Sequence, residues 1–210
     1  MDRLFGINEM VKANCQDCNG CFDCCTGMGD TITLDPLDVH RIRLFLDVDF
    51  KTLSYGQFAM SNYNGIMLPC LRLLDEKERC AFLNEKGRCS IHPARPGICR
   101  LFPLGRYYEN GSHGYFLQEN ECLNKNRTKI KVGRWIDTPD LKSYEKFVDD
   151  WHYFLEEVRK NIKNVSITEQ TQINNYLLNT FYVLAFPEDN FYEKFYVRLA
   201  NARKKIFSED

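Results

Sequence analysis

The chain has 210 residues, of which 44% are hydrophobic and 27% are charged. This length and composition allow an ordinary hydrophobic core in one domain, or in one domain with an extension. The formal net charge of −1 gives no overall attraction to nucleic acid or to an anionic membrane. No apolar run has the length of a signal peptide or a membrane span, so we expect a soluble, cytoplasmic protein.

The N-terminal segment is rich in cysteine. Five of the ten cysteines lie between residues 15 and 25, and each Cys-x-x-Cys step lets two sulfurs reach one ion with little strain. Cytosolic thiols stay reduced, which favours metal binding over a disulfide framework. Adjacent side chains of an extended segment diverge, so Cys24 and Cys25 need not share one role. The other cysteines form a second group: Cys70, Cys80, Cys89, Cys99 and Cys122.

A strand and a helix are predicted after the cysteine run. Residues 31–34 have the composition of a short strand. The next two residues, Asp35 and Pro36, predict the start of a helix that continues to about Leu46. Asp is a good N-cap, and Pro is favoured at the first helical position.

Two hairpins are predicted in the middle of the chain. Residues 80–83 and 88–91 flank a turn whose Gly87 can adopt a positive φ. This first hairpin would bring the two cysteines of its arms together. Turn-forming residues between 106–108 and 115–118 predict the second hairpin.

The C-terminal part has the pattern of helices. From Leu141 to Val158, apolar residues recur at steps of three and four, and Thr138 before Pro139 is the expected N-cap. Two further helices are predicted over residues 168–184 and 188–206.

These elements together predict an α+β protein. A small cysteine-rich metal-binding domain with short β-hairpins would occupy residues 1–125. A helical C-terminal region, residues 126–210, would pack on it.

The cysteine pattern as a whole resembles a known family. The chain carries a CxxCxxCC motif near its N-terminus, and a later block includes the sequence Arg-Pro-Gly-Ile-Cys-Arg-Leu-Phe-Pro. These features resemble the cysteine-cluster proteins known as the YkgJ-like or CxxCxxCC family, and the similarity covers about residues 15–125. In the family's N-terminal motif the matching residues are Cys18, Cys21, Cys24 and Cys25. In its second block they are Cys80, Cys89, His92, Arg95, Pro96, Cys99, Arg100 and Pro103.

The resemblance implies a zinc- or iron-chelating site. Thiolates suit zinc, copper(I) and iron-sulfur clusters alike, but closely repeated Cys-x-x-Cys steps resemble cluster-binding runs more than zinc ribbons. We therefore expect an iron-sulfur cluster, with zinc as the alternative. The predicted ligands are Cys18, Cys21, Cys24, Cys25, Cys80, Cys89, Cys99 and Cys122.

Two arginines flank one of these ligands. Arg95 and Arg100 lie on either side of Cys99 and could offset the negative charge of cluster sulfurs. For Arg95 a hydrogen bond to a loop carbonyl is an open alternative. Ligation by His92 also stays open, whereas Cys15 and Cys70 lie outside the shared motif and are weaker ligand candidates.

Three functions remain open from the sequence. The first is a cluster protein for redox or protein-modification chemistry, and the second is a zinc-stabilised interaction module without catalysis. The third is an enzyme similar to the flagellin lysine N-methylase, which contains a related domain. A protein partner or substrate is compatible with each of them. No glycine-rich nucleotide-binding loop supports the third function.

Overall fold

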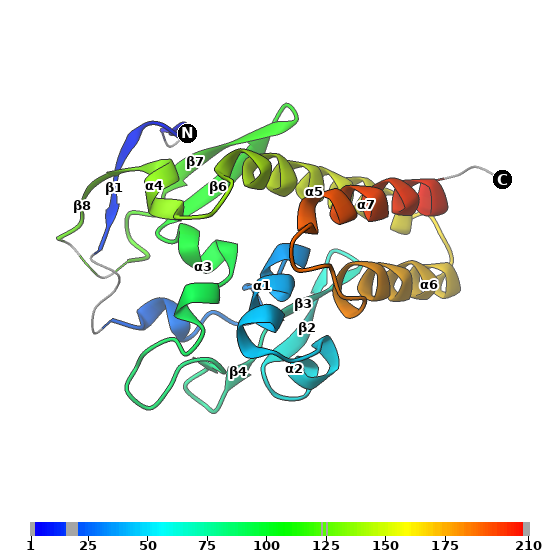
Figure 1. The fold of residues 1–210 in the computed structure, drawn as a ribbon, viewed down its shortest axis with the longest axis horizontal. Coiled ribbons are helices and arrows are strands. Elements are labelled where there is room, and N and C mark those ends of the chain that lie inside the picture. The colour runs from blue at the N-terminus through cyan, green and yellow to red at the C-terminus, as the bar shows by residue number, and fades with distance from the viewer. Residues whose placement is uncertain (1–2, 16–20, 123, 125, 208–210) are drawn as a thin grey trace.

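The structure is a computed structural model that describes residues 3–15, 21–122, 124 and 126–207. Short strands and short helices make up most of the chain before residue 140, and longer helices follow (Figure 1). The protein is therefore α+β, as expected. The described helices are α1 (Pro36–Leu46), α2 (Phe50–Gly56), α3 (Gly97–Leu101), α4 (Val132–Ile136), α5 (Leu141–Ile162), α6 (Ile167–Leu178) and α7 (Phe191–Phe207). Shorter helical turns are η2 (Asp23–Cys25), η3 (His92–Ala94) and η4 (Asn179–Val183).

The described strands pair only as two-stranded antiparallel ribbons, in the order β1–β8, β2–β3, β4–β5 and β6–β7. The ribbon β1–β8 joins residues near the N-terminus to residues beyond 125. Each remaining ribbon joins strands that are neighbours in sequence. The strands are β1 (Met10–Asn14), β2 (Phe58–Tyr63), β3 (Ile66–Leu71), β4 (Leu73–Leu74), β5 (Arg79–Cys80), β6 (Leu104–Glu109), β7 (Ser112–Leu117) and β8 (Thr128–Lys131).

Helix α1 begins where the sequence predicts. The Asp35 carboxylate accepts a hydrogen bond from the Asp38 amide (2.8 Å), and the Asp38 carboxylate accepts one from the Asp35 amide (3.2 Å). These two bonds form a capping box, and Pro36 occupies the first turn. The helix ends at Leu46, as expected.

The second predicted hairpin is confirmed as β6–β7. Its turn residues Asn110 and Gly111 both have positive φ, 52° and 82°. This geometry matches the right-handed twist of the flanking strands, and Asn-Gly is the sequence that most favours it.

Two predicted β segments differ from the structure. Residues 31–34 are not a strand: they make only the isolated bridge Thr33–Cys70 beside β3. The predicted arms of the first hairpin share only the isolated bridge Leu83–Cys89. Cys80 pairs with Leu73 in β4 instead, and the following residues turn immediately, so no regular first arm can form.

The predicted C-terminal helices are present with shifted starts. Helix α5 is capped by Asp140 rather than Thr138, because the Asp140 carboxylate accepts from the Ser143 amide (3.3 Å). Helix α6 continues through η4, and α7 begins at Phe191 rather than near residue 188.

One buried core runs through both parts of the chain. The Tyr182 hydroxyl donates to the Leu34 carbonyl at 3.0 Å, and the Asn174 side chain bonds to the backbone of Gly65 and Met67. The division into residues 1–125 and 126–210 stays a prediction. No helix in the described ranges has the length and apolarity needed to cross a bilayer.

Candidate metal centre

A backbone contact brings the N-terminal cysteine run to the second cysteine group. Cys25 ends the turn η2, and the next residue, Thr26, forms a β-bridge with Arg79. The Gly27 amide then donates to the Glu78 carbonyl at 3.0 Å. These contacts place Cys25 beside Cys80, although more than fifty residues separate them in sequence.

An aromatic contact at the turn after residue 83 also holds the two cysteine groups close together. Phe22 lies between two cysteines of the N-terminal run, and its ring packs on Gly87. A Cβ added to Gly87 would come within 2.8 Å of the Phe22 ring, so only glycine allows this distance. Gly87 also has φ +68°, which disfavours other residues.

Helix α3 carries Cys99 and is held at both ends. At its start, the buried Asp38 carboxylate accepts a hydrogen bond from the Gly97 amide at 2.7 Å. At its end, the Trp135 indole donates to the carbonyls of Leu101 (3.1 Å) and Phe102 (3.2 Å). The position of Cys99 therefore depends on α1 and α4, two elements distant in sequence.

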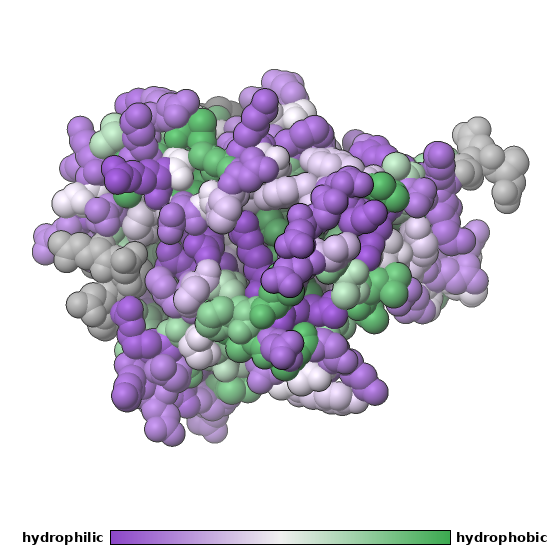
Figure 2. All heavy atoms as spheres, in the orientation of Figure 1, coloured by the Kyte–Doolittle hydropathy of each residue, from purple (hydrophilic) through white to green (hydrophobic). Residues whose placement is uncertain are grey.

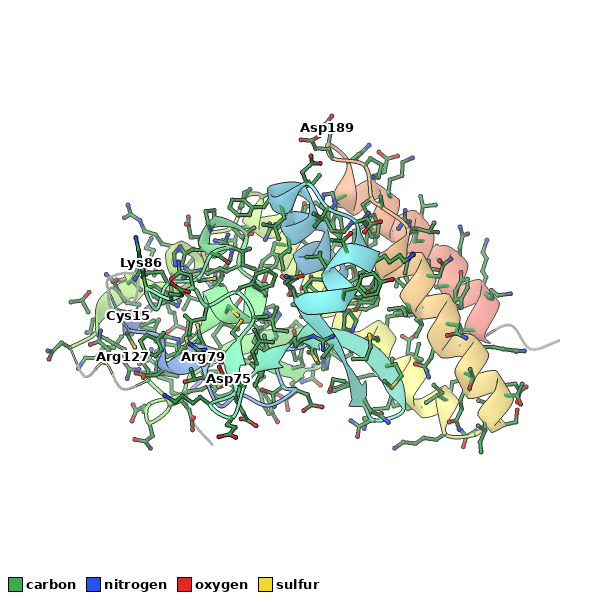
Figure 3. The ribbon with its side chains drawn as sticks, turned by 90° about the horizontal axis from the view of Figure 1, so that it is seen from below. Cys15, Asp75, Arg79, Lys86, Arg127 and Asp189 are labelled. Atoms are coloured by element: carbon green, nitrogen blue, oxygen red, sulfur yellow. The ribbon has the colours of Figure 1, made fainter. Side chains whose placement is uncertain are left out.

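These contacts produce a pocket that collects sulfur from both cysteine groups. Its cavity volume is about 80 Å³, several times the roughly 10–15 Å³ that one water requires. Figure 3 shows Cys15 and the Arg79–Asp75 ion pair in the half of the molecule that lies away from the C-terminal helices. The cysteines that line the pocket are Cys21, Cys24, Cys25, Cys80, Cys89 and Cys99.

The electrostatics of the pocket also show that the sulfurs are close neighbours. A hydrogen bond between adjacent thiols lowers the pKa of Cys24 and raises the pKa of Cys25. Burial raises the pKa of Cys80, Cys89 and Cys99, and the charge of the Cys24 thiolate raises each of them further. Ionised sulfurs would repel one another here, and a bound cation would reverse that repulsion.

The donor set fits a thiophilic metal or an iron-sulfur cluster, because several thiols converge on a pocket with apolar walls. Within the described ranges, no three Cys, His, Asp or Glu side chains are already arranged to hold one ion. Closure around a metal would thus require side-chain movement.

The two predicted arginines differ in their contacts. Arg95 lines the pocket, and its guanidinium lies 2.9 Å from His92 Nε2. Its positive charge lowers the pKa of Cys24 and of Cys89, although other causes are larger. If Arg95 donates to Nε2, this nitrogen of His92 is not available to a metal.

Arg100 points to the backbone instead. It is buried, and its three nitrogens donate to the carbonyls of Pro93, Arg95 and Asp137. It therefore ties η3 and the end of α4 to α3. A direct role for Arg100 at a cofactor stays a prediction.

The remaining candidates lie elsewhere or outside the description. Cys18 falls outside the described residues. Cys122 is buried but does not line the pocket, so its ligation stays a prediction. Cys15 is buried and close enough for its charge to affect Cys24. Cys70 is 1% exposed in β3, which fits a small apolar core residue.

Sequence reasoning missed the residues that assemble the pocket. Phe22, Asp38 and Trp135 act through contacts with residues at least 33 positions away in sequence. Each is unremarkable in its local pattern. Gly87 was visible as a turn residue, but its contact with Phe22 was not.

Comparison with known families agrees with this geometry. The family described as "CxxCxxCC: Putative zinc- or iron-chelating domain" matches residues 17–129. The chain belongs to the CxxCxxCC family. Comparisons with curated proteins and with solved structures gave no significant match. The match begins after Cys15, within the cysteine run, and ends in β8, so it contains every cysteine that lines the pocket.

Proposed function

We propose that the protein holds an iron-sulfur cluster in this pocket and uses it for redox or protein-modification chemistry. The observation that carries the proposal is the convergence of six cysteines, from both sequence groups, on one pocket. Closely spaced Cys-x-x-Cys steps are typical of cluster-binding chains. A protein partner or substrate belongs to the proposal, because a redox centre must exchange electrons with something else.

The residues of the pocket have separate tasks in this proposal. The cysteines bind the cluster, which supplies electron-transfer chemistry when present. Phe82, Ile91 and Phe102 form apolar walls that limit water access. Arg95 contributes the positive charge that offsets the thiolates.

One competing function is a zinc-stabilised interaction module, because the family description names zinc as well as iron. Anaerobically purified protein should be brown and contain iron with acid-labile sulfide. A preparation with stoichiometric zinc, no sulfide and no visible chromophore would contradict the cluster proposal and support the zinc module.

A pair of cysteine variants tests the location of the metal. Cys99→Ala removes a sulfur that lines the pocket, whereas Cys70→Ala removes a buried sulfur that does not. We expect Cys99→Ala to lose most of the bound metal and Cys70→Ala to retain it. Equal metal content per chain in the two variants would contradict the assignment of Cys99.

A further inference from the structure

A second cavity is lined by a different set of α3 residues from those that line the cysteine pocket. Its volume is about 380 Å³, within the range of roughly 300–1,000 Å³ typical of small-molecule sites. Ile98 and Leu101 line this cavity, whereas Cys99 and Phe102 line the cysteine pocket. The described lining residues of the two cavities do not overlap, so this is a separate site.

Arg106 is the residue of this cavity whose buried hydrogen-bond donor lacks an acceptor. It lies on β6, and one guanidinium nitrogen donates to the Tyr144 hydroxyl at 2.8 Å. Its Nε atom is buried and has no hydrogen-bond partner. Within the described ranges Arg106 also makes no ion pair. The guanidinium also faces the rings of Tyr115 and Tyr144, at 6.0 Å and 5.4 Å from their centroids. The buried Nε–H still lacks an acceptor, which is costly unless a ligand supplies one.

Burial raises the pKa of Asp35, and Arg106 lies near enough for its charge to oppose this rise, so part of the positive charge is offset within the cavity. Asp35 and Asp38 are occupied as reciprocal caps of α1, and Asp38 also holds the Gly97 amide. Burial, with the charge of the neighbouring Asp35, raises the pKa of Asp38 to about 8. Burial lowers the pKa of His152, which stays neutral, and its ring stacks on Tyr108 at 3.6 Å.

The rest of the wall is largely apolar and aromatic. Leu68, Phe116, Trp151 and Leu155 are among its apolar lining residues, and the Gln118 amide is a further polar group. Apolar walls around a single cation match an organic anion better than an inorganic one. We propose that this cavity binds a small organic carboxylate, with the carboxylate on Arg106 and an apolar body against Trp151 and Phe116. The site does not depend on which metal the cysteines hold.

The two tryptophans of the chain provide a direct readout. Trp151 lines the second cavity and Trp135 lines the cysteine pocket. The metal-loaded protein would be labelled with 5-fluorotryptophan, and its two ¹⁹F resonances assigned with Trp135→Phe. The probes are 4-hydroxyphenylacetate, indole-3-acetate and hexanoate, each compared with its uncharged amide.

At least one carboxylate should shift the Trp151 resonance saturably and leave the Trp135 resonance in place. Its amide should bind at least about tenfold more weakly, because charged hydrogen bonds are lost. Arg106→Gln should weaken binding of the carboxylate by a similar factor. Arg3→Gln, which removes an exposed arginine of the same charge, should leave binding unchanged.

Two results would overturn the proposal. One is the absence of a saturable Trp151 shift with every carboxylate up to about 10 mM, beyond the affinity of a useful site. The other is equal binding of acids and amides to the wild-type protein. The acid and amide comparison decides the question even if Arg106→Gln does not fold.

Discussion

Gly87 and Phe22 determine how closely the two cysteine groups approach. The Phe22 ring occupies the space where any other residue at position 87 would place its Cβ. The same position requires a positive φ. One glycine thus meets two separate requirements, one of backbone conformation and one of contact distance.

Gly87→Ala should destabilise the cysteine pocket more than a matched glycine substitution elsewhere. Gly111 also has a positive φ, but a Cβ there would meet nothing within 4 Å. Both alanines carry the left-handed penalty of roughly 1–2 kcal/mol, and only Gly87→Ala adds a clash, worth about 1–3 kcal/mol. Urea unfolding of both variants measures the difference. Equal losses of stability would show that the Phe22 contact is unimportant.

At the scale of single residues, the sequence predicted which residues belong to the site better than it predicted their contacts. The family's cysteine motif selected eight candidate ligands, and six of them line one pocket. Cys122 does not line it, Cys18 lies outside the described residues, and ligation by any of the eight stays a prediction. The sequence could not predict that Arg100 bonds three backbone carbonyls. That arrangement depends on where η3 and α4 end in space.

At the scale of elements, α1 supports the cysteine site through α3. Asp38 caps its own helix and also accepts from the Gly97 amide, which begins the helix that carries Cys99. The cap could be predicted from Asp35 and Pro36, since it is a local pattern. The contact with Gly97 spans 59 positions and has no local signal.

Asp38→Ala should therefore reduce both stability and metal content. It leaves the amides of Asp35 and Gly97 without their acceptor, at a cost of about 2–4 kcal/mol for two buried donors. Asp49→Ala is the control, because Asp49 also caps a helix, α2, by accepting a hydrogen bond from the Thr52 amide. Thermal unfolding and metal analysis of both variants give the comparison. Unchanged metal content in Asp38→Ala would mean that α3 keeps Cys99 in place without this bond.

The predicted β segments failed for a related reason. Short β pairings depend on which partner is nearest in the folded chain. Cys80 pairs with Leu73 rather than with a residue of the predicted arm 88–91. The β6–β7 hairpin succeeded because its Asn-Gly turn encodes the pairing locally.

At the scale of the whole molecule, the helical part and the cysteine-rich part share a core. Trp135, beyond residue 125, even lines the cysteine pocket.

The face shown in Figure 2 is mostly polar, with an apolar patch near its centre over the region of α1. Exposed apolar residues at the end of α1 are Leu44, Phe45 and Leu46. Periodicity predicted the long helices well, because a buried stripe is repeated over many turns, as in α5.

Metal removal should loosen this molecule unevenly. Around residues 21–28 the described backbone has only η2 and one isolated bridge, so the bound metal would supply much of its order. Helix α5 has 22 residues and buries Phe147, Trp151 and Phe154 against other aromatic rings. Amide hydrogen exchange after anaerobic chelation should therefore rise strongly over residues 21–28 and 80–99 and little in α5. Restoring the metal should restore protection. An equal rise in α5 would show that the metal stabilises the shared core as one unit, and no rise in residues 21–28 would show that the metal is not structural.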